Sequence, residues 1–209
     1  METPKLKKSL PKYLTLEQSL ELLSKVDGKN SRRDYCILVL FLNCGMRLSE
    51  LVGLDLNDIR LSNATMKITG KGNKERMVYL NEACLDAIKQ YLAVRPKDGL
   101  ADRNALFISQ QKKRISPKTV QYIVKKYLAE IDLGGPGYSV HKLRHTAATL
   151  MYQQGHVDIR VLKDILGHEN LGTTEIYTHV SNVQMANAAK ANPLASVKQN
   201  TFSKKLIKK

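Results

Sequence analysis

The residues best suited to chemistry in this 209-residue chain lie between positions 141 and 177. They are His141, Arg144 and His145 in one short stretch, His168 in a Leu-Gly-His sequence, and Tyr177 nine residues later. Arginine can hold an anion through two parallel hydrogen bonds, histidine can exchange a proton near neutral pH, and tyrosine can act as a nucleophile. Such a set could bind an anionic group and carry out a nucleophilic substitution on it without a metal ion.

Each of these residues taken alone has a more ordinary explanation. A single histidine on a helix is usually structural or exposed, and one tyrosine among nine is usually a packing residue. The prediction therefore rests on their arrangement. His141 and Arg144 are three residues apart, so on a helix both side chains project from one face. His145 is four residues from His141 and either shares this face or turns toward the core.

Zinc binding is one alternative for the same stretch. The spacing of His141 and His145 suits a metal ion, but Lys142 stands where an HExxH motif has its glutamate. A cation beside two candidate ligands argues against a metal site.

A helix-turn-helix DNA reader over residues 143–180 is a second alternative, because two helices joined by a short turn are compatible with that motif. The helix that would read the DNA carries Asp158 and Asp164. A phosphate backbone would repel both carboxylates, which makes this a poor recognition helix.

The net charge favours a nucleic-acid partner. Lysine and arginine number 34 against 19 acidic residues, a formal net charge of +15 at pH 7. Seven lysines lie near the two ends and could be solubilising tails, but subtracting them still leaves +8. A basic excess of this size attracts phosphate backbones.

Composition also indicates the broad class of the protein. A hydrophobic content of 43% is enough for a core, and no apolar run approaches the ~20 residues of a membrane span. The N-terminus lacks the apolar stretch of a secretory signal. Three cysteines without CxxC spacing argue against a disulfide framework or a zinc knuckle. We expect one domain of ordinary size in a reduced cytoplasmic setting, with no membrane partner.

Apolar periodicity and capping signals predict a mainly α fold with a small three-stranded antiparallel β-sheet. Thr15 and Gln18 form a capping-box sequence, and Gly45 suits a left-handed helix end. The sequence between residues 70 and 74 is a glycine-rich hairpin tip without the spacing of a Walker loop. The predicted strands are 58–61, 65–69 and 75–80, and the predicted helices are about 15–26, 31–44, 48–52, 81–95, 116–133, 139–155, 158–166, one starting at 173 or 174, and 182–191.

Taken together, the motifs resemble those of the tyrosine recombinases, the family of phage integrases and Xer-type enzymes. That family carries an arginine in a Gly-x-Arg-x-Ser-Glu-like stretch, a lysine on a β-hairpin tip, His-x-x-Arg, Leu-Gly-His, and a tyrosine about nine residues later. The matching positions here are Arg47, Lys71, His141, Arg144, His168 and Tyr177. The agreement extends from about residue 10 to about residue 180, and six positions in order are far more specific than any one fragment.

The resemblance implies a clamp for a phosphodiester. Arg47 and Arg144 would hold its two non-bridging oxygens, since arginine donates bidentate hydrogen bonds and stays protonated. His168 would be a third donor. Each preorganised donor of this kind is typically worth ~10²–10³ in rate. Glu50 and His145 would play supporting roles, orienting Arg47 and the His-x-x-Arg helix.

The resemblance also implies the reacting groups. Tyr177 would attack the phosphorus and form a covalent 3′-phosphotyrosine, His141 would accept the phenol proton, and Lys71 would protonate the departing 5′-oxygen. No carboxylate cluster for Mg²⁺ is evident around these residues, so we expect neither a metal ion nor a cofactor.

The implied biological reaction is site-specific DNA recombination, as in integration or excision, with one strand cleaved at a time. The partner would be double-stranded DNA carrying recombination sites, bound by a homo-tetramer that is monomeric when free. We expect a basic linker over residues 1–10, a catalytic domain over 11–180, and a C-terminal helix and basic tail over 181–209. That last segment could dock on a neighbouring protomer, fold back onto its own, or fray.

Full recombinases of this family usually carry an additional N-terminal helical domain that closes around DNA. Here the catalytic pattern begins almost at residue 10, so we expect either a truncated chain or a naturally short member. A truncated chain would bind DNA weakly and recombine poorly, with its chemistry intact.

Two alternative functions remain open at this point. Type IB topoisomerases use a similar residue set but relax supercoils without choosing a site, and a catalytically silent module would bind DNA only. A plasmid relaxation assay identifies the first, and a covalent adduct on a nicked duplex excludes the second.

Overall fold

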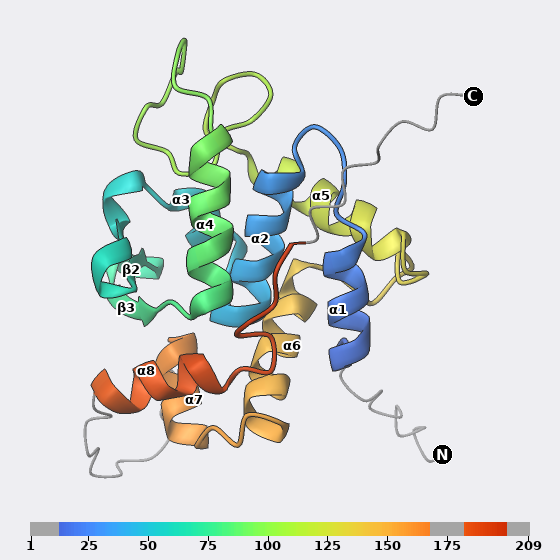
Figure 1. Cartoon of the computed structure of the whole chain (residues 1–209), viewed down its shortest axis with the longest axis vertical. Coiled ribbons are helices and arrows are strands. Elements are labelled where there is room, and N and C mark those ends of the chain that lie inside the picture. The colour runs from blue at the N-terminus through green and yellow to red at the C-terminus, as the bar shows by residue number, and fades with distance from the viewer. Residues whose placement is uncertain (1–12, 168–181, 200–209) are drawn as a thin grey trace, which may run out of the picture.

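The computed structural model describes residues 13–167 and 182–199. It is mainly helical with one three-stranded antiparallel sheet, as the sequence predicts (Figure 1). The elements in chain order are α1 (Leu16–Ser24), α2 (Ser31–Cys44), α3 (Leu48–Gly53), β1 (Ile59–Arg60), β2 (Thr65–Thr69), β3 (Glu75–Tyr79), α4 (Glu82–Val94), α5 (Pro117–Ala129), α6 (Val140–Gln153), α7 (Ile159–Leu166) and α8 (Asn182–Ala191).

Helix α2 forms the centre of the main core. Every residue from Arg33 to Cys44 is buried, and residues 35–42 are apolar around the whole circumference of the helix. The buried polar side chains are paired, Arg33 with Asp34 and Asn43 with the Val39 carbonyl. Helices α4 and α6 pack against it, and α1 and α5 also contact it (Figure 1). The neighbouring helices therefore hold the C-terminal end of α2 in place, and this fixes the position of the residues that follow it.

The sheet has the order β1-β2-β3, and its long hairpin pairs Thr65 with Tyr79 and Thr69 with Glu75. The Gly70 N–H donates to the Lys74 carbonyl at 2.8 Å and closes the hairpin. The turn between these residues is a short 3₁₀ segment over 71–73. The predicted hairpin tip is confirmed, and it places the backbone of Lys71 in the turn.

Several predicted helix ends are confirmed. Thr15 and Gln18 form a capping box at the start of α1, and Asp158 accepts a hydrogen bond from the Arg160 N–H at the start of α7. Gly45 ends α2 in the left-handed conformation with a φ of 58°. These ends were predictable because side-chain caps and left-handed glycines depend on local sequence.

One predicted helix end is wrong. Helix α5 ends at Ala129 and not near residue 133, because the Leu133 N–H turns back to the Leu128 carbonyl and Asp132 takes a φ of 58°. This difference arises from the tertiary turn that follows α5, which periodicity does not reveal. The predicted start of α6 is confirmed, since Ser139 is its N-cap residue, although the Ser139 side chain makes no capping hydrogen bond.

The C-terminal segment folds back onto its own chain. Helix α8 contacts α7 and β3, and the stretch after it runs beside α2 (Figure 1). Asn192 Nδ2 donates to the Leu42 carbonyl at 3.1 Å, and the Ala83 N–H donates to the Ala195 carbonyl at 2.7 Å. Leu194 is fully buried in the main core. Residues 182–199 are thus part of the packed structure.

Among the helices of residues 13–167 and 182–199, none has both the length and the apolar character needed to cross a membrane.

Gly45→Ala is expected to destabilise the fold for two separate reasons. The φ of 58° costs a non-glycine residue roughly 1–2 kcal/mol, and an added Cβ would lie 2.5 Å from Leu166 Cδ2. Gly28→Ala is the matched control, since Gly28 has a φ of 84° but open space around it. In urea unfolding both variants should lose stability, and Gly45→Ala should lose clearly more. Equal losses would contradict the close approach of Leu166.

Candidate active site

Three chain segments meet where α2 ends. Gly45 turns the chain out of α2, and Arg47 follows as the residue that caps α3. The His-x-x-Arg stretch lies on α6, and α7 ends beside it at Gly167, which is left-handed with a φ of 63°. Helix ends expose unsatisfied backbone groups, and here those groups hold the arginines.

Three consecutive carbonyl groups at the end of α7 each accept a hydrogen bond from a different arginine. Ile165 accepts from Arg76 Nε at 3.2 Å, Leu166 from Arg144 Nη2 at 2.6 Å, and Gly167 from Arg47 Nη2 at 3.1 Å. The negative end of the helix dipole favours cations at this position. The three guanidinium groups are therefore gathered directly before His168.

Arg144 is a buried cation held by neutral groups. Arg144 is 6% exposed. In addition to the Leu166 contact, Arg144 Nη1 donates to the Gly45 carbonyl at 2.5 Å. Burial, followed by the positive charge of Arg47, lowers the pKa of Arg144 to about 10, so it stays protonated at neutral pH. Within residues 13–167 and 182–199, no carboxylate forms an ion pair with it. A buried charge of this kind is costly unless an anion joins it.

Arg47 is more exposed and is oriented by Glu50. The Arg47 backbone N–H donates to Glu50 Oε2 at 2.7 Å, and Arg47 Nη1 donates to Oε1 at 2.9 Å. The Arg47 side chain is 42% exposed, whereas that of Glu50 is 1% exposed. Glu50 thus orients Arg47 from the buried side, and the Arg47 guanidinium remains accessible.

Glu50 is ionised far below its ordinary titration range. Burial alone would raise its pKa, but hydrogen bonds and charge from Arg76 and Arg47 lower it to about 2. Because the folded-state pKa lies below the ordinary value of 4.5, the ionised carboxyl stabilises the fold above about pH 4.5. That stabilisation is lost as the pH falls toward 2.

Glu50→Gln is expected to remove this pH dependence. The pKa difference corresponds to stability on the order of 3 kcal/mol, which the wild-type chain should lose as acid protonates Glu50. The variant should be less stable at pH 7, where Arg47 and Arg76 lose their carboxylate, and its stability should change less between pH 5 and about pH 2. Urea unfolding at several pH values measures both effects. A variant with the wild-type pH slope would contradict the assignment.

His141 and His145 contact each other on the exposed side of α6. Their Nε2 atoms are 3.0 Å apart and the rings meet edge to face. Burial, followed by the charges of His141, Lys142 and Arg144, lowers the pKa of His145 and favours its neutral form. One Nε2–H can then donate to the other Nε2, which orients the His141 ring. His145, for which a supporting role is predicted, therefore contacts His141 directly.

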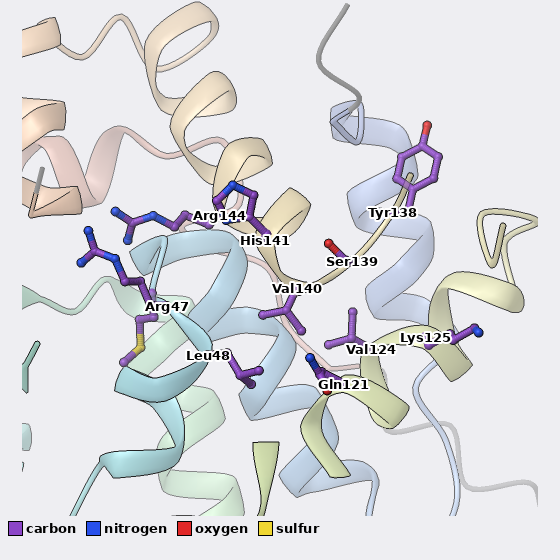
Figure 2. Close-up of a pocket in the computed structure, with 11 residues that line it drawn as sticks. Arg47, Leu48, Gln121, Val124, Lys125, Tyr138, Ser139, Val140, His141 and Arg144 are labelled. Atoms are coloured by element: carbon purple, nitrogen blue, oxygen red, sulfur yellow. The ribbon is translucent and has the colours of Figure 1, made fainter. Parts of the chain in front are cut away.

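A pocket of about 560 Å³ opens beside these groups. Arg47 and Arg144 reach toward the same side of it from two different elements, and His141 lies on the α6 wall (Figure 2). The remaining wall is partly apolar and partly polar, formed by Met46, Leu48, Gln121, Val124, Lys125, Tyr138, Ser139 and Val140. The arrangement suits an anion bound to a larger molecule that has both polar and apolar surfaces.

The structure brings together Arg47, Glu50, His141, Arg144 and His145. The backbone of Lys71 lies in the hairpin turn next to Gly70, and a Cβ on Gly70 would be 3.6 Å from Glu50 Oε1. The predicted residues His168 and Tyr177 lie outside the described residues.

Sequence reasoning missed Arg76. This residue of β3 pairs with Glu50 through two hydrogen bonds, from Nη1 to Oε1 at 2.6 Å and from Nη2 to Oε2 at 3.0 Å. One signal was available, because Glu50 is an acid on a short apolar helix and a buried acid needs a cationic partner. The sequence did not indicate which of 34 basic residues would provide it.

Comparison with known proteins gives one clear family. The sequence model described as "Phage integrase family" matches residues 12–183. The chain belongs to the phage integrase family. The resemblance to tyrosine recombinases inferred from the six motif residues is thereby confirmed.

Individual relatives of this integrase-family chain agree. It is 57% identical over 195 residues to the tyrosine recombinase XerC of Caldanaerobacter subterraneus subsp. tengcongensis, covering 93% of this chain and 55% of that protein. It is 42% identical over 180 residues to XerC of Psychromonas ingrahamii, covering 85% and 59%. The crystal structure of the XerH site-specific recombinase bound to difH substrate, in a pre-cleavage complex, matches with a TM-score of 0.68 and 30% identity, covering 82% of this chain and 51% of that chain.

The chain therefore spans a little over half the length of the curated relatives it matches, 55% and 59%.

Proposed function

We propose that this chain cleaves and rejoins DNA strands in site-specific recombination through a covalent 3′-phosphotyrosine. The observation that carries the proposal is Arg144, a buried, protonated guanidinium whose hydrogen-bond partners among residues 13–167 and 182–199 are carbonyl groups, with a second arginine beside it. A scissile phosphate suits this site because two arginines can donate to its two non-bridging oxygens, and the adjoining pocket of about 560 Å³ leaves room for the groups attached to it. Family membership supports the same reading.

In the proposed reaction Arg47 and Arg144 bind the non-bridging oxygens of one phosphodiester, with His168 as a third donor. Both arginines are already oriented by backbone carbonyls, so little reorganisation is needed as negative charge grows on these oxygens. This preorganisation is the main contribution of the described residues to the rate.

The bond changes are an in-line substitution at phosphorus. The Tyr177 oxygen forms a bond to phosphorus while the bond to the 5′-oxygen breaks. The phenol proton passes to His141, and Lys71 protonates the 5′-oxygen, which leaves as a hydroxyl group. Attack by that hydroxyl, or by one from a second duplex, reverses the step and reseals a strand without an external energy source.

We further propose that the functional unit is a homo-tetramer holding two DNA duplexes, as recombination by strand exchange requires four active sites. The XerC and XerH names of the relatives support a role in recombination at defined sites. No observation on this chain favours a topoisomerase or a silent binding module.

Covalent trapping tests this function. A pool of nicked duplexes with randomised sequence is incubated with the chain, and adducts resistant to denaturant are isolated and sequenced. A nick close to the cleavage site lets the short 5′-hydroxyl fragment diffuse away, so the adduct accumulates. The proposal expects adducts on a restricted set of sequences. Adducts without sequence preference, together with plasmid relaxation, would support a topoisomerase, and no adduct at all would support a silent module.

A further inference from the structure

Arg76 shares the partner Glu50 with Arg47, although it is not part of the proposed chemistry. Both arginines donate to the Glu50 carboxylate, and both donate to carbonyls at the end of α7. The Arg76 side chain is 16% exposed, against 42% for Arg47. Arg76 is thus the inner of two arginines that flank one carboxylate.

Because Arg76 pairs with the Glu50 carboxylate, the positive charge of Arg47 stays available to the phosphate. Within the part of the chain that the structure describes, Glu50 accepts two hydrogen bonds from Arg76 and two from Arg47, and its side chain is 1% exposed. If Arg76 were absent, Arg47 would be the one cation among the described side chains that pairs with this carboxylate. A tight ion pair between them would then compete with the phosphate for the Arg47 guanidinium.

Arg76 and its partner Glu50 each lie against the residue that precedes another predicted catalytic residue. A Cβ on Gly167 would lie 3.2 Å from Arg76 Cδ and 3.3 Å from its Cζ, so the side chain lies directly against the residue that precedes His168. Its partner Glu50 lies against Gly70, which precedes Lys71. One side chain therefore connects the hairpin, the start of α3 and the end of α7.

We propose that Arg76 is a positioning residue that balances the charge of Glu50 and holds the Arg47 guanidinium in place for the scissile phosphate. This inference rests on the proposed function, because it assigns Arg76 an effect on the same strand-cleavage step. It assigns Arg76 no contact with DNA.

The experiment compares two substrates with Arg76→Gln. One is a nicked duplex recovered by covalent trapping, and the other is the same duplex with a neutral methylphosphonate at the scissile position. Adduct formation is followed in single turnover at saturating protein. We expect Arg76→Gln to slow cleavage of the phosphodiester by ~10–10²-fold, as small misplacements in an active site do. The loss on the methylphosphonate should be several-fold smaller, because that substrate has one charged oxygen fewer for the arginines to stabilise.

Arg114→Gln is the matched control. Arg114 also pairs with two carboxylates, Asp55 and Asp102, and donates to the Val52 and Leu54 carbonyls at the opposite end of α3 from Arg47. The Arg114→Gln variant should lose stability, as Arg76→Gln does, but it should cleave both substrates within about twofold of the wild-type rate.

A folded Arg76→Gln variant with the wild-type rate, or with equal losses on both substrates, would overturn the inference alone. A wild-type chain that forms no adduct would overturn the proposed function and this inference with it. If Arg76→Gln does not fold, Arg76→Lys replaces it, since it keeps a positive charge beside Glu50 but loses the fork that donates to both carboxylate oxygens. Arg76→Lys should also lose more rate on the phosphodiester than on the methylphosphonate, and equal losses would again overturn the inference.

Discussion

Changing Tyr177 to phenylalanine is expected to abolish the covalent protein–DNA adduct. The substitution removes only the phenolic oxygen that forms the bond to phosphorus, so no phosphotyrosine can form even if the arginines still bind the phosphate. The adduct is measured with end-labelled nicked duplex on a denaturing gel. DNA binding, measured by gel shift, should stay within a few-fold of wild type.

Tyr152→Phe is the control for this experiment. Tyr152 is 54% exposed on α6, the helix that carries His141 and Arg144, so it is an accessible tyrosine on the same element. Its loss should leave adduct formation unchanged. An adduct that persists in Tyr177→Phe would mean that another residue is the nucleophile, and disappearance with Tyr152→Phe would point to that residue.

Arg144→Gln should lower the rate of strand cleavage by about 10³-fold. Glutamine removes the positive charge and the fork that donates to the phosphate, and each such donor is typically worth ~10²–10³. Arg144→Lys keeps the charge but loses the fork, and should be slowed by ~10² or more. Both rates are measured in single turnover with saturating protein, which separates cleavage from binding.

Arg95→Gln distinguishes loss of chemistry from loss of packing. Arg95 is 8% exposed and, like Arg144, donates to backbone carbonyls, those of Leu106, Pro96, Arg103 and Ala105. Its substitution should destabilise the fold without slowing cleavage by a folded chain. A cleavage rate in Arg144→Gln close to that of Arg95→Gln would contradict the role of Arg144 as a phosphate ligand.

The elements of the fold were largely predictable because their signals are local. The Thr15 capping box, the left-handed Gly45 and the hairpin around residues 70–74 depend on residues within a few positions of one another. The end of α5 was not predictable in this way, because the turn through Asp132 depends on where the chain goes next.

The site was predictable in part. The spacing of His141 and Arg144 on one helix follows from helical geometry, and α6 carries both. That Arg47 would meet Arg144 came from the family resemblance, since 97 residues separate them and no local rule joins them. The structure adds the reason for their approach, which is that both donate to the end of α7.

Arg76 shows what the sequence cannot provide. Its position in an ordinary strand gives no sign that it pairs with Glu50, 26 positions earlier, or donates to Ile165, 89 positions later. Partners of this kind are fixed by packing between elements and not by periodicity. The return of residues 192–195 to α2 and α4 has the same origin.

Peptide mapping of the trapped adduct by tandem mass spectrometry identifies the nucleophile and the polarity of the cut. We predict one modified peptide, with the nucleotide joined through its 3′-phosphate to the Tyr177 oxygen, and a free 5′-hydroxyl on the released strand. Attachment to a different residue, or release of a 5′-phosphate, would contradict it.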